Sequence, residues 1–211
     1  MVSLRRISLL LFALVVLAGL PARDAHGADG EASLKYVSAA VKMDLLVPTS
    51  HVNSTFAIHL GLRYLLPWWN PNLSFGFDLG YYPMWGEGQN MDAQIGLYDY
   101  SWRLHLMPLS IGPQVDIPTG IPWLVPFGEV GYTAIFAWSR GKSFGTTTKQ
   151  SDVAHGYYLG GGVEFRFGRF GGVLGQYRYT GTFLDFGYPQ YNLEPGDIGG
   201  HSVRVGYRYI F

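Results

Sequence analysis

Histidine close to serine is the first combination in the sequence that could perform chemistry. His201 precedes Ser202, His51 lies three residues before Ser54, and His155 stands alone. A hydrolytic serine needs a histidine that takes its proton and an acid that orients the histidine. Successive residues of a strand project to opposite faces, so His201 and Ser202 would not meet. His51 has no carboxylate close by. We therefore predict no catalytic residues.

Residues suited to binding a metal are also sparse. The chain has six histidines, and none of them is paired at i, i+2 or i, i+4 spacing. The absence of cysteine excludes disulfides, a thiol nucleophile and cysteine-ligated zinc. Asp185, Glu194 and Asp197 share one segment and could hold a divalent cation loosely, but a solvated loop accounts for them better. We predict no metal and no cofactor.

Ionisable residues of both signs form the largest candidate site. They recur singly at alternate positions of short segments, among glycines and opposite apolar residues. A buried charge is costly unless it is paired, so residues that share an interior face must form ion pairs. We predict such a network, in which arginines surround Glu129 and Glu164. Its members are Lys42, Asp44, Arg63, Asp78, Arg103, Glu129, Glu164, Arg166, Arg178, Arg204 and Arg208.

The elements that must position these charges are strands. Apolar residues alternate with polar or small ones, and this period of two is typical of strands with two unlike faces. In one of these segments the alternation slips at Pro108, which predicts a β-bulge. Eight segments show the pattern: residues 34–47, 55–66, 73–82, 100–115, 127–138, 156–167, 172–183 and 202–211.

The apolar face of these strands is unusually large and aromatic, whereas the polar face holds glycines and isolated charges. This pattern suits a barrel whose apolar face meets lipid and whose polar face fills a narrow lumen. Lipid cannot satisfy an open sheet edge, so such a sheet must close. Alternate connections are short, as in the periplasmic turns of outer-membrane barrels. Ten strands remain an alternative if residues 83–99 hide a hairpin extension.

Tryptophan placement and composition agree with this interpretation. Tryptophan is enriched where a membrane meets water, and we predict two girdles. Trp68, Trp69 and Trp123 form the periplasmic one, and Trp85, Trp102 and Trp138 the outer one. The 211 residues include 16% aromatic and 14% charged residues with a net charge of zero, which argues against disorder and against a nucleic-acid-binding surface.

The first residues have the layout of a secretory signal peptide. Arg5 and Arg6 precede an apolar run at residues 7–20, which Pro21 ends. The run is too short to span a membrane as a helix, which takes about 20 apolar residues. We predict a signal peptide at residues 1–27 and a single barrel domain at residues 28–211.

Several motifs resemble a known family. The last residues carry aromatics at alternate positions, Tyr207, Tyr209 and Phe211, similar to the C-terminal signal of bacterial outer-membrane proteins. Residues 160–167 and 176–180 resemble the closing strands of the small OmpA/OmpX/OmpW-like barrels, and residues 107–110 and 125–131 their middle strands. The resemblance implies an all-β, eight-stranded antiparallel up-and-down transmembrane β-barrel, integral to the bacterial outer membrane.

The resemblance also implies partners and a range of functions. We expect contact with outer-membrane lipid and lipopolysaccharide, delivery by the barrel-assembly machinery, a monomer, and no nucleic acid. Arg140, Lys142 and Lys149 could contact lipopolysaccharide phosphates. The first functional hypothesis is a non-enzymatic structural or envelope-maintaining barrel. The second is a narrow pore or OmpW-like channel for small or hydrophobic solutes, with a lateral opening near Pro108. The third is a lipid-modifying enzyme.

Overall fold

The computed structural model describes residues 37–48, 54–92, 96–143, 146–167, 171–184 and 196–211. The expected signal peptide lies outside these residues. Among them, no helix is long and apolar enough to cross a membrane. The strands are β1 (Val37–Pro48), β2 (Thr55–Leu65), β3 (Leu73–Asp92), β4 (Gly96–Asp116), β5 (Leu124–Ser143), β6 (Thr146–Arg166), β7 (Gly171–Leu184), β8 (Gly196–Asp197) and β9 (Gly200–Ile210).

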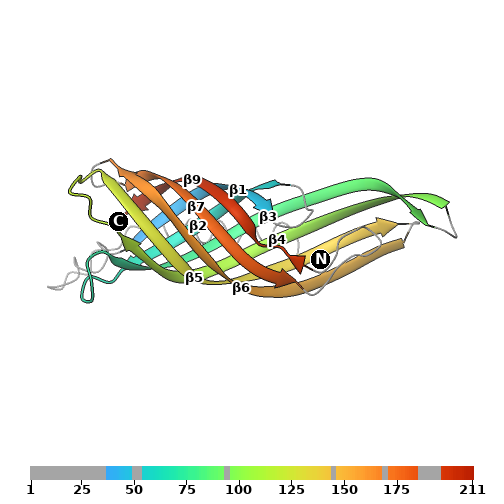
Figure 1. Ribbon diagram of the computed structural model, residues 1–211, viewed down its shortest axis with the longest axis horizontal. Helices are drawn as coiled ribbons and strands as arrows, with labels where there is room; N and C mark the ends of the chain where they lie inside the picture. Colours follow the sequence, from blue (N-terminus) through green and yellow to red (C-terminus); the bar gives the residue numbers. More distant parts are fainter. Residues whose placement is uncertain (1–36, 49–53, 93–95, 144–145, 168–170, 185–195) are drawn as a thin grey trace, which may run out of the picture. The chain divides into compact units, whose positions relative to one another are not determined.

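Eight of these strands close into an antiparallel barrel (Figure 1). Neighbours in sequence pair from β1 to β7, β7 pairs with β9, and β9 pairs with β1. The two-residue β8 pairs only with the end of β7. The predicted eight-stranded barrel is therefore confirmed. The ten-strand alternative is wrong, because described residues of the 83–99 region lengthen β3 and β4 within one hairpin.

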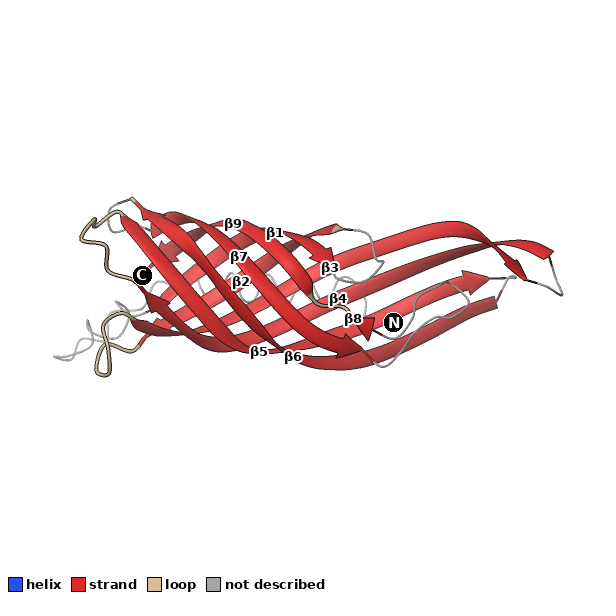
Figure 2. Cartoon of the chain, viewed as in Figure 1, coloured by secondary structure: helices blue, strands red, loops and turns tan. Residues whose placement is uncertain are grey.

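Four neighbouring strands are much longer than the others. Strands β3 to β6 have 20 or 21 residues, whereas β1, β2, β7 and β9 have 11 to 14. The four long strands continue beyond the barrel as paired hairpins (Figure 2). We call residues 84–92, 96–104, 139–143 and 146–150 the projecting sheet. The barrel end that carries it is the projecting end, and the opposite one is the turn end.

The two faces of the barrel strands are inverted relative to a water-soluble protein. Outward side chains are apolar and exposed, as at Val41, Met43, Phe56 and Ile58, which are 54–69% exposed. Inward positions of the same strands hold Lys42, Asp44, His59 and Arg63, all under 9% exposed. Such strands belong in lipid, where the outward face needs no polar group and the lumen shelters the charges.

Strand β4 passes Pro108 without a bulge. Leu79 pairs with Leu109 and Tyr82 with Leu106, so the register with β3 is the same on both sides of the proline. Pro108 has no amide hydrogen, and the pairings of the two β3 residues between them are missing. The predicted bulge is therefore wrong. The alternation of apolar and polar residues slips for another reason. The inward residues of β4 are apolar at Leu104 and Leu106 but polar at Ser110 and Gln114.

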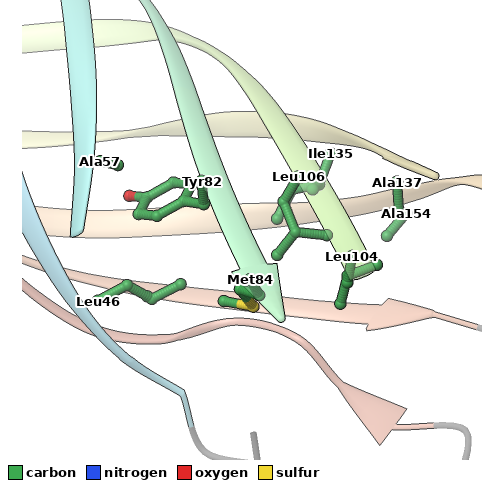
Figure 3. Packing of buried hydrophobic residues seen from close by; sticks show 9 residues of the cluster. All are labelled: Leu46, Ala57, Tyr82, Met84, Leu104, Leu106, Ile135, Ala137 and Ala154. Carbon is green, nitrogen blue, oxygen red and sulfur yellow. The ribbon is translucent and has the colours of Figure 1, made fainter. Parts of the chain in front are cut away.

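An apolar cluster fills the interior next to the projecting sheet (Figure 3). All its members are under 9% exposed, and Trp102 and Ile198 pack against them. Burial of Leu or Met side chains contributes about 1.5–3 kcal/mol each. Apolar packing, without ion pairs, therefore stabilises the part of the interior that lies next to the projecting sheet. Its members are Leu46, Ala57, Tyr82, Met84, Leu104, Leu106, Ile135, Ala137 and Ala154.

Candidate functional site: the ion-pair network of the lumen

Asp78 is the meeting point of three donors from three strands. The Lys42 ammonium on β1 donates to Asp78 Oδ2. His59 Nδ1 on β2 lies 2.5 Å from Asp78 Oδ1, and Arg204 Nη1 on β9 donates to the same oxygen at 3.4 Å. These donors satisfy both oxygens of a carboxylate that is 6% exposed. Burial without them would be costly, so the fold fixes this constellation tightly.

Asp44 lies beside this group and shares Arg204 with it. Arg204 Nε donates to Asp44 Oδ2 at 2.7 Å, and the Tyr82 hydroxyl donates to the same oxygen. His59 Nε2 lies 3.1 Å from Asp44 Oδ2 and 2.8 Å from the Tyr82 hydroxyl oxygen. Arg204 and Asp44 face each other across the β1–β9 pairing that closes the barrel.

Glu129 and Arg178 form a second centre on the other side of the lumen. Arg178 Nε and Nη2 both approach Glu129 Oε1, at 2.7 and 2.6 Å. Gln176 Nε2 donates to the same oxygen at 2.5 Å. The Arg178 guanidinium also lies over the Tyr158 ring, 4.0 Å from its centroid. Such a cation–π contact stabilises a cation that is withdrawn from water, and Arg178 is only 2% exposed.

A third group occupies the turn end. Glu164, which is fully buried, accepts from the Arg208 guanidinium and from Arg166 Nε at 3.1 Å. Arg63 Nη1 lies 4.0 Å from Glu164. Asp116 forms ion pairs with two of these three arginines. Its Oδ1 lies 2.7 Å from Arg63 Nη2, and its Oδ2 lies 3.1 Å from Arg166 Nη2. Two carboxylates and three arginines thus form one continuous cluster.

Glycines create the room that the longer ion pairs need. Glu129 and Arg178 stand on β5 and β7, and the residue between them in register is Gly160 on β6. A Cβ atom at Gly160 would lie 2.9 Å from the Tyr177 carbonyl oxygen and 3.1 Å from Glu129 Oε1. Gly61 on β2 is in register with Asp78 and with Ala40, two residues from Lys42; a Cβ atom there would lie 3.3 Å from Asp78 Oδ2 and 3.4 Å from Lys42 Cε.

The network also includes Asp116, His59 and Gln176, which the sequence pattern does not predict as members. Asp116 ends β4 one residue beyond the predicted segment 100–115, and only its two arginine partners show that its carboxylate belongs to the network. His59 and Gln176 lie on the inward faces of their strands, but a side chain without a fixed charge does not require an ion-pair partner, so the sequence does not assign either to the network. Their alternation with apolar neighbours was the available signal.

Two predicted residues, Trp102 and Arg103, lie on the opposite faces of β4 from those that the alternation predicts. Even-numbered residues of β4 point inward, so Trp102 packs against the apolar cluster instead of joining a girdle. Arg103 is exposed on the outward face and takes no part in the lumen network. Both assignments assumed that the apolar residues Leu104 and Leu106 meet lipid, whereas they fill the lumen.

The other predicted aromatic residues lie at the two ends. Trp68, Trp69 and Trp123 are 55–78% exposed in the connections at the turn end. Trp85 is 71% exposed at the projecting end, where Trp138 stacks on His105 with ring centroids 5.7 Å apart. The alternating aromatics near the end of the chain, Tyr207, Tyr209 and Phe211, are all exposed.

Outward histidines pair with tyrosines in three successive hairpins. In each pair the hydroxyl oxygen hydrogen-bonds the Nδ1 atom, at 2.7 Å for the first pair and 2.5 Å for the third. In each pair the histidine is two residues away, toward the projecting end, from the position that lies opposite the tyrosine in the register. His155 and His201 are therefore engaged on the outer surface, while Ser202 is buried inside. The pairs are Tyr81–His105, Tyr132–His155 and Tyr177–His201.

The network leaves little free space in the described lumen. One cavity of about 30 Å³ borders Lys42, Arg63 and Arg178, and one of about 20 Å³ borders Leu106 and Arg204. Each is close to the size of a single water molecule. Side chains therefore fill most of the space around these ion pairs.

Comparison with known proteins agrees with this architecture. The family model described as "Outer membrane protein beta-barrel domain" matches residues 7–211. Among curated proteins, none matches significantly. A major outer membrane protein from Thermus thermophilus is similar in structure, with a TM-score of 0.52 and 13% identity over 82% of this chain and 99% of the other.

Two further solved structures are similar. The N-terminal β-barrel domain of Pseudomonas aeruginosa OprF has a TM-score of 0.49 and 11% identity, over 82% of this chain and 97% of the other. Neisserial surface protein A has a TM-score of 0.48 and 18% identity, over 83% and 96%. The extent of the family match decides the assignment: the chain belongs to the outer membrane protein β-barrel domain family and is an integral protein of the outer membrane.

Proposed function

We propose that this protein is a non-enzymatic, structural barrel of the outer membrane whose lumen is closed. The observation that carries the proposal is the pairing inside the barrel. Each described lumen carboxylate contacts at least one lumen cation, and the apolar cluster covers the network toward the projecting end. An interior filled in this way supports a rigid barrel without an open channel through the membrane.

Passage of a solute would require the lumen charges to separate. Arg178, Arg204 and Glu164 are at most 3% exposed and make several contacts each. Breaking a buried ion pair and leaving one partner unpaired costs about 3–5 kcal/mol. Several pairs would have to open together, and this supports a closed lumen over a steady pore.

The two alternative functions find less support in the described residues. The predicted lateral opening near Pro108 depends on a bulge, but the register with β3 is the same on both sides of this proline. Of the histidines considered for hydrolysis, His201 bonds Tyr177 and His155 bonds Tyr132 on the outer surface, and His51 lies outside the described residues. The side chain of Ser202 is buried in the lumen.

Conductance in a planar bilayer tests the proposal. We expect no openings from the refolded protein once protease protection confirms its insertion. The double variant Glu129→Ser/Arg178→Ser, which removes both side chains of one ion pair, should admit water and produce openings. The variant Glu87→Gln on the projecting sheet is the matched control and should stay silent. Steady openings of the wild type would overturn the closed-lumen proposal.

A further inference from the structure

Three cations lie side by side on the outward face of the projecting sheet. Arg103 pairs in register with Arg140, and Arg140 pairs with Lys149, on strands β4, β5 and β6. All three are exposed, and we call them the cationic row. The three strands run next to one another in this region (Figure 1).

The cationic row is a repulsive arrangement in the isolated chain. Like charges directly opposite each other destabilise a sheet. Within the described part of the chain, none of the three makes an ion pair. Two carboxylates share this face, but Asp99 accepts from Gln89 Nε2 at 2.9 Å and Glu87 pairs in register with Ser101. An anion bound between the strands would turn the repulsion into attraction.

The position of the row indicates which anion this is. Arg140 lies two residues beyond Trp138 on the same face of β5, and Arg103 two residues beyond His105 on β4. Trp138 and His105 stack on each other, and Tyr81 hydrogen-bonds His105. Amphipathic aromatic rings prefer the level of lipid headgroups. The row therefore lies where headgroups end and water begins.

A hollow on this surface is large enough for a headgroup. It has a volume of about 1040 Å³ and is lined by Trp85, Glu87, Arg103, Arg140 and Lys142, among others. The indole of Trp85, which pairs in register with Arg103, continues the row on β3. Arginine binds phosphate through a planar pair of donors, and lysine adds a compact charge.

We propose that the cationic row binds the phosphate groups of a phosphorylated glycolipid in the outer leaflet. The apolar surface below it would contact the acyl chains, while Arg103, Arg140 and Lys149 hold the phosphates on the sugar headgroup. The inference is independent of the closed lumen, because it concerns only the outward face. It assigns a binding role to Arg103, which the lumen network does not use.

Binding of bis-phosphorylated lipid A tests the site. The refolded full chain is titrated with phosphatidylcholine nanodiscs that contain either this lipid or its dephosphorylated form. We expect the triple variant Arg103→Gln/Arg140→Gln/Lys149→Gln to lose at least tenfold in affinity for the phosphorylated lipid. Added salt should weaken wild-type binding, because it screens exposed charges. The control variant Gln150→Ala, next to Lys149 but on the opposite face of the projecting sheet, should bind as tightly as the wild type.

Two outcomes would overturn the proposal. The first is equal affinity of the triple variant and the wild type, or of the two lipids. The second is full displacement of the lipid by inorganic phosphate, which would indicate a site for the free ion. Folding of the triple variant is checked by thermal unfolding without anionic lipid. Its melting temperature should equal or exceed that of the wild type, because the repulsion between the cations is gone.

Discussion

Glu129 and Arg178 are joined by hydrogen bonds across a strand that places only Gly160 between them. The pair therefore links β5 directly to β7, although neither strand touches the other through its backbone. The same device links β1 to β3 through Lys42 and Asp78 above Gly61. Ion pairs of this kind brace the barrel across alternate strands.

We expect Gly160→Ala to destabilise the barrel. Its new methyl group would press on the Tyr177 carbonyl oxygen and on Glu129, and overpacking of this kind costs about 1–3 kcal/mol. Urea unfolding of the protein refolded into lipid vesicles measures the loss. Gly128→Ala on the neighbouring strand is the control, because a Cβ atom there meets nothing within 4 Å. Equal stability of the two variants would show that the pair has room to move.

Neutralising Glu164 should have a larger effect. Glu164→Gln keeps the shape of the side chain but leaves Arg208 and Arg166 without their shared negative charge. We expect a loss of about 3–5 kcal/mol in the free energy of unfolding, as for other broken buried ion pairs. The exposed Glu87→Gln provides the comparison and should change it by less than about 0.5 kcal/mol. A combined Glu164→Gln/Arg208→Met variant should recover part of the loss.

The apolar cluster makes its own contribution to stability. Leu106 is 2% exposed inside the barrel, and Leu106→Ala should cost about 2–5 kcal/mol through the cavity it leaves. Leu97, 65% exposed on the projecting sheet, is the matched position. Leu97→Ala should be nearly neutral. The idea that the cluster is packed would fail if both variants unfolded at the same urea concentration.

The outward tyrosine–histidine pairs should be energetically coupled. A double-mutant cycle with Tyr177→Phe and His201→Leu isolates the bond between the hydroxyl and the imidazole. Cross-strand pairs and net hydrogen bonds each contribute roughly 0.5–1 kcal/mol, and we expect a coupling energy of this size. The cycle is measured by vesicle unfolding, and additive effects of the two substitutions would contradict the coupling.

The strands within the membrane were predictable from sequence because lipid and lumen demand unlike residues. Apolar outward residues such as Val41 alternate with charged inward residues such as Lys42. This difference in polarity predicts both the number of strands and which face of each strand meets lipid. The contrast fails where β4 enters the apolar cluster. Leu104 and Leu106 are apolar although they point inward, and Arg103 is charged although it points outward. The alternation of polarity therefore predicts the wrong faces for these three residues.

The strand ends near the projecting sheet were set too short for a related reason. In the projecting sheet the neighbours Lys149 and Gln150, which point to opposite faces, are both polar and exposed, so polarity no longer alternates. Backbone pairing continues all the same, up to Thr146 opposite Ser143. The individual partners in the lumen could not be predicted, because they depend on which residues share a level in the register. Arg204 and Asp44 are 160 positions apart.

That separation has a consequence for biogenesis. Arg204 on the last strand is a shared cation for Asp44 and Asp78 near the beginning of the barrel. A chain that lacked β9 would enter the membrane without the guanidinium that these two carboxylates share, and would keep only Lys42 and His59 as their basic neighbours among the described contacts. Insertion of such an intermediate is unfavourable, since an unpaired charge in lipid is expensive. The electrostatics of the seam thus make stable insertion conditional on delivery of the complete chain.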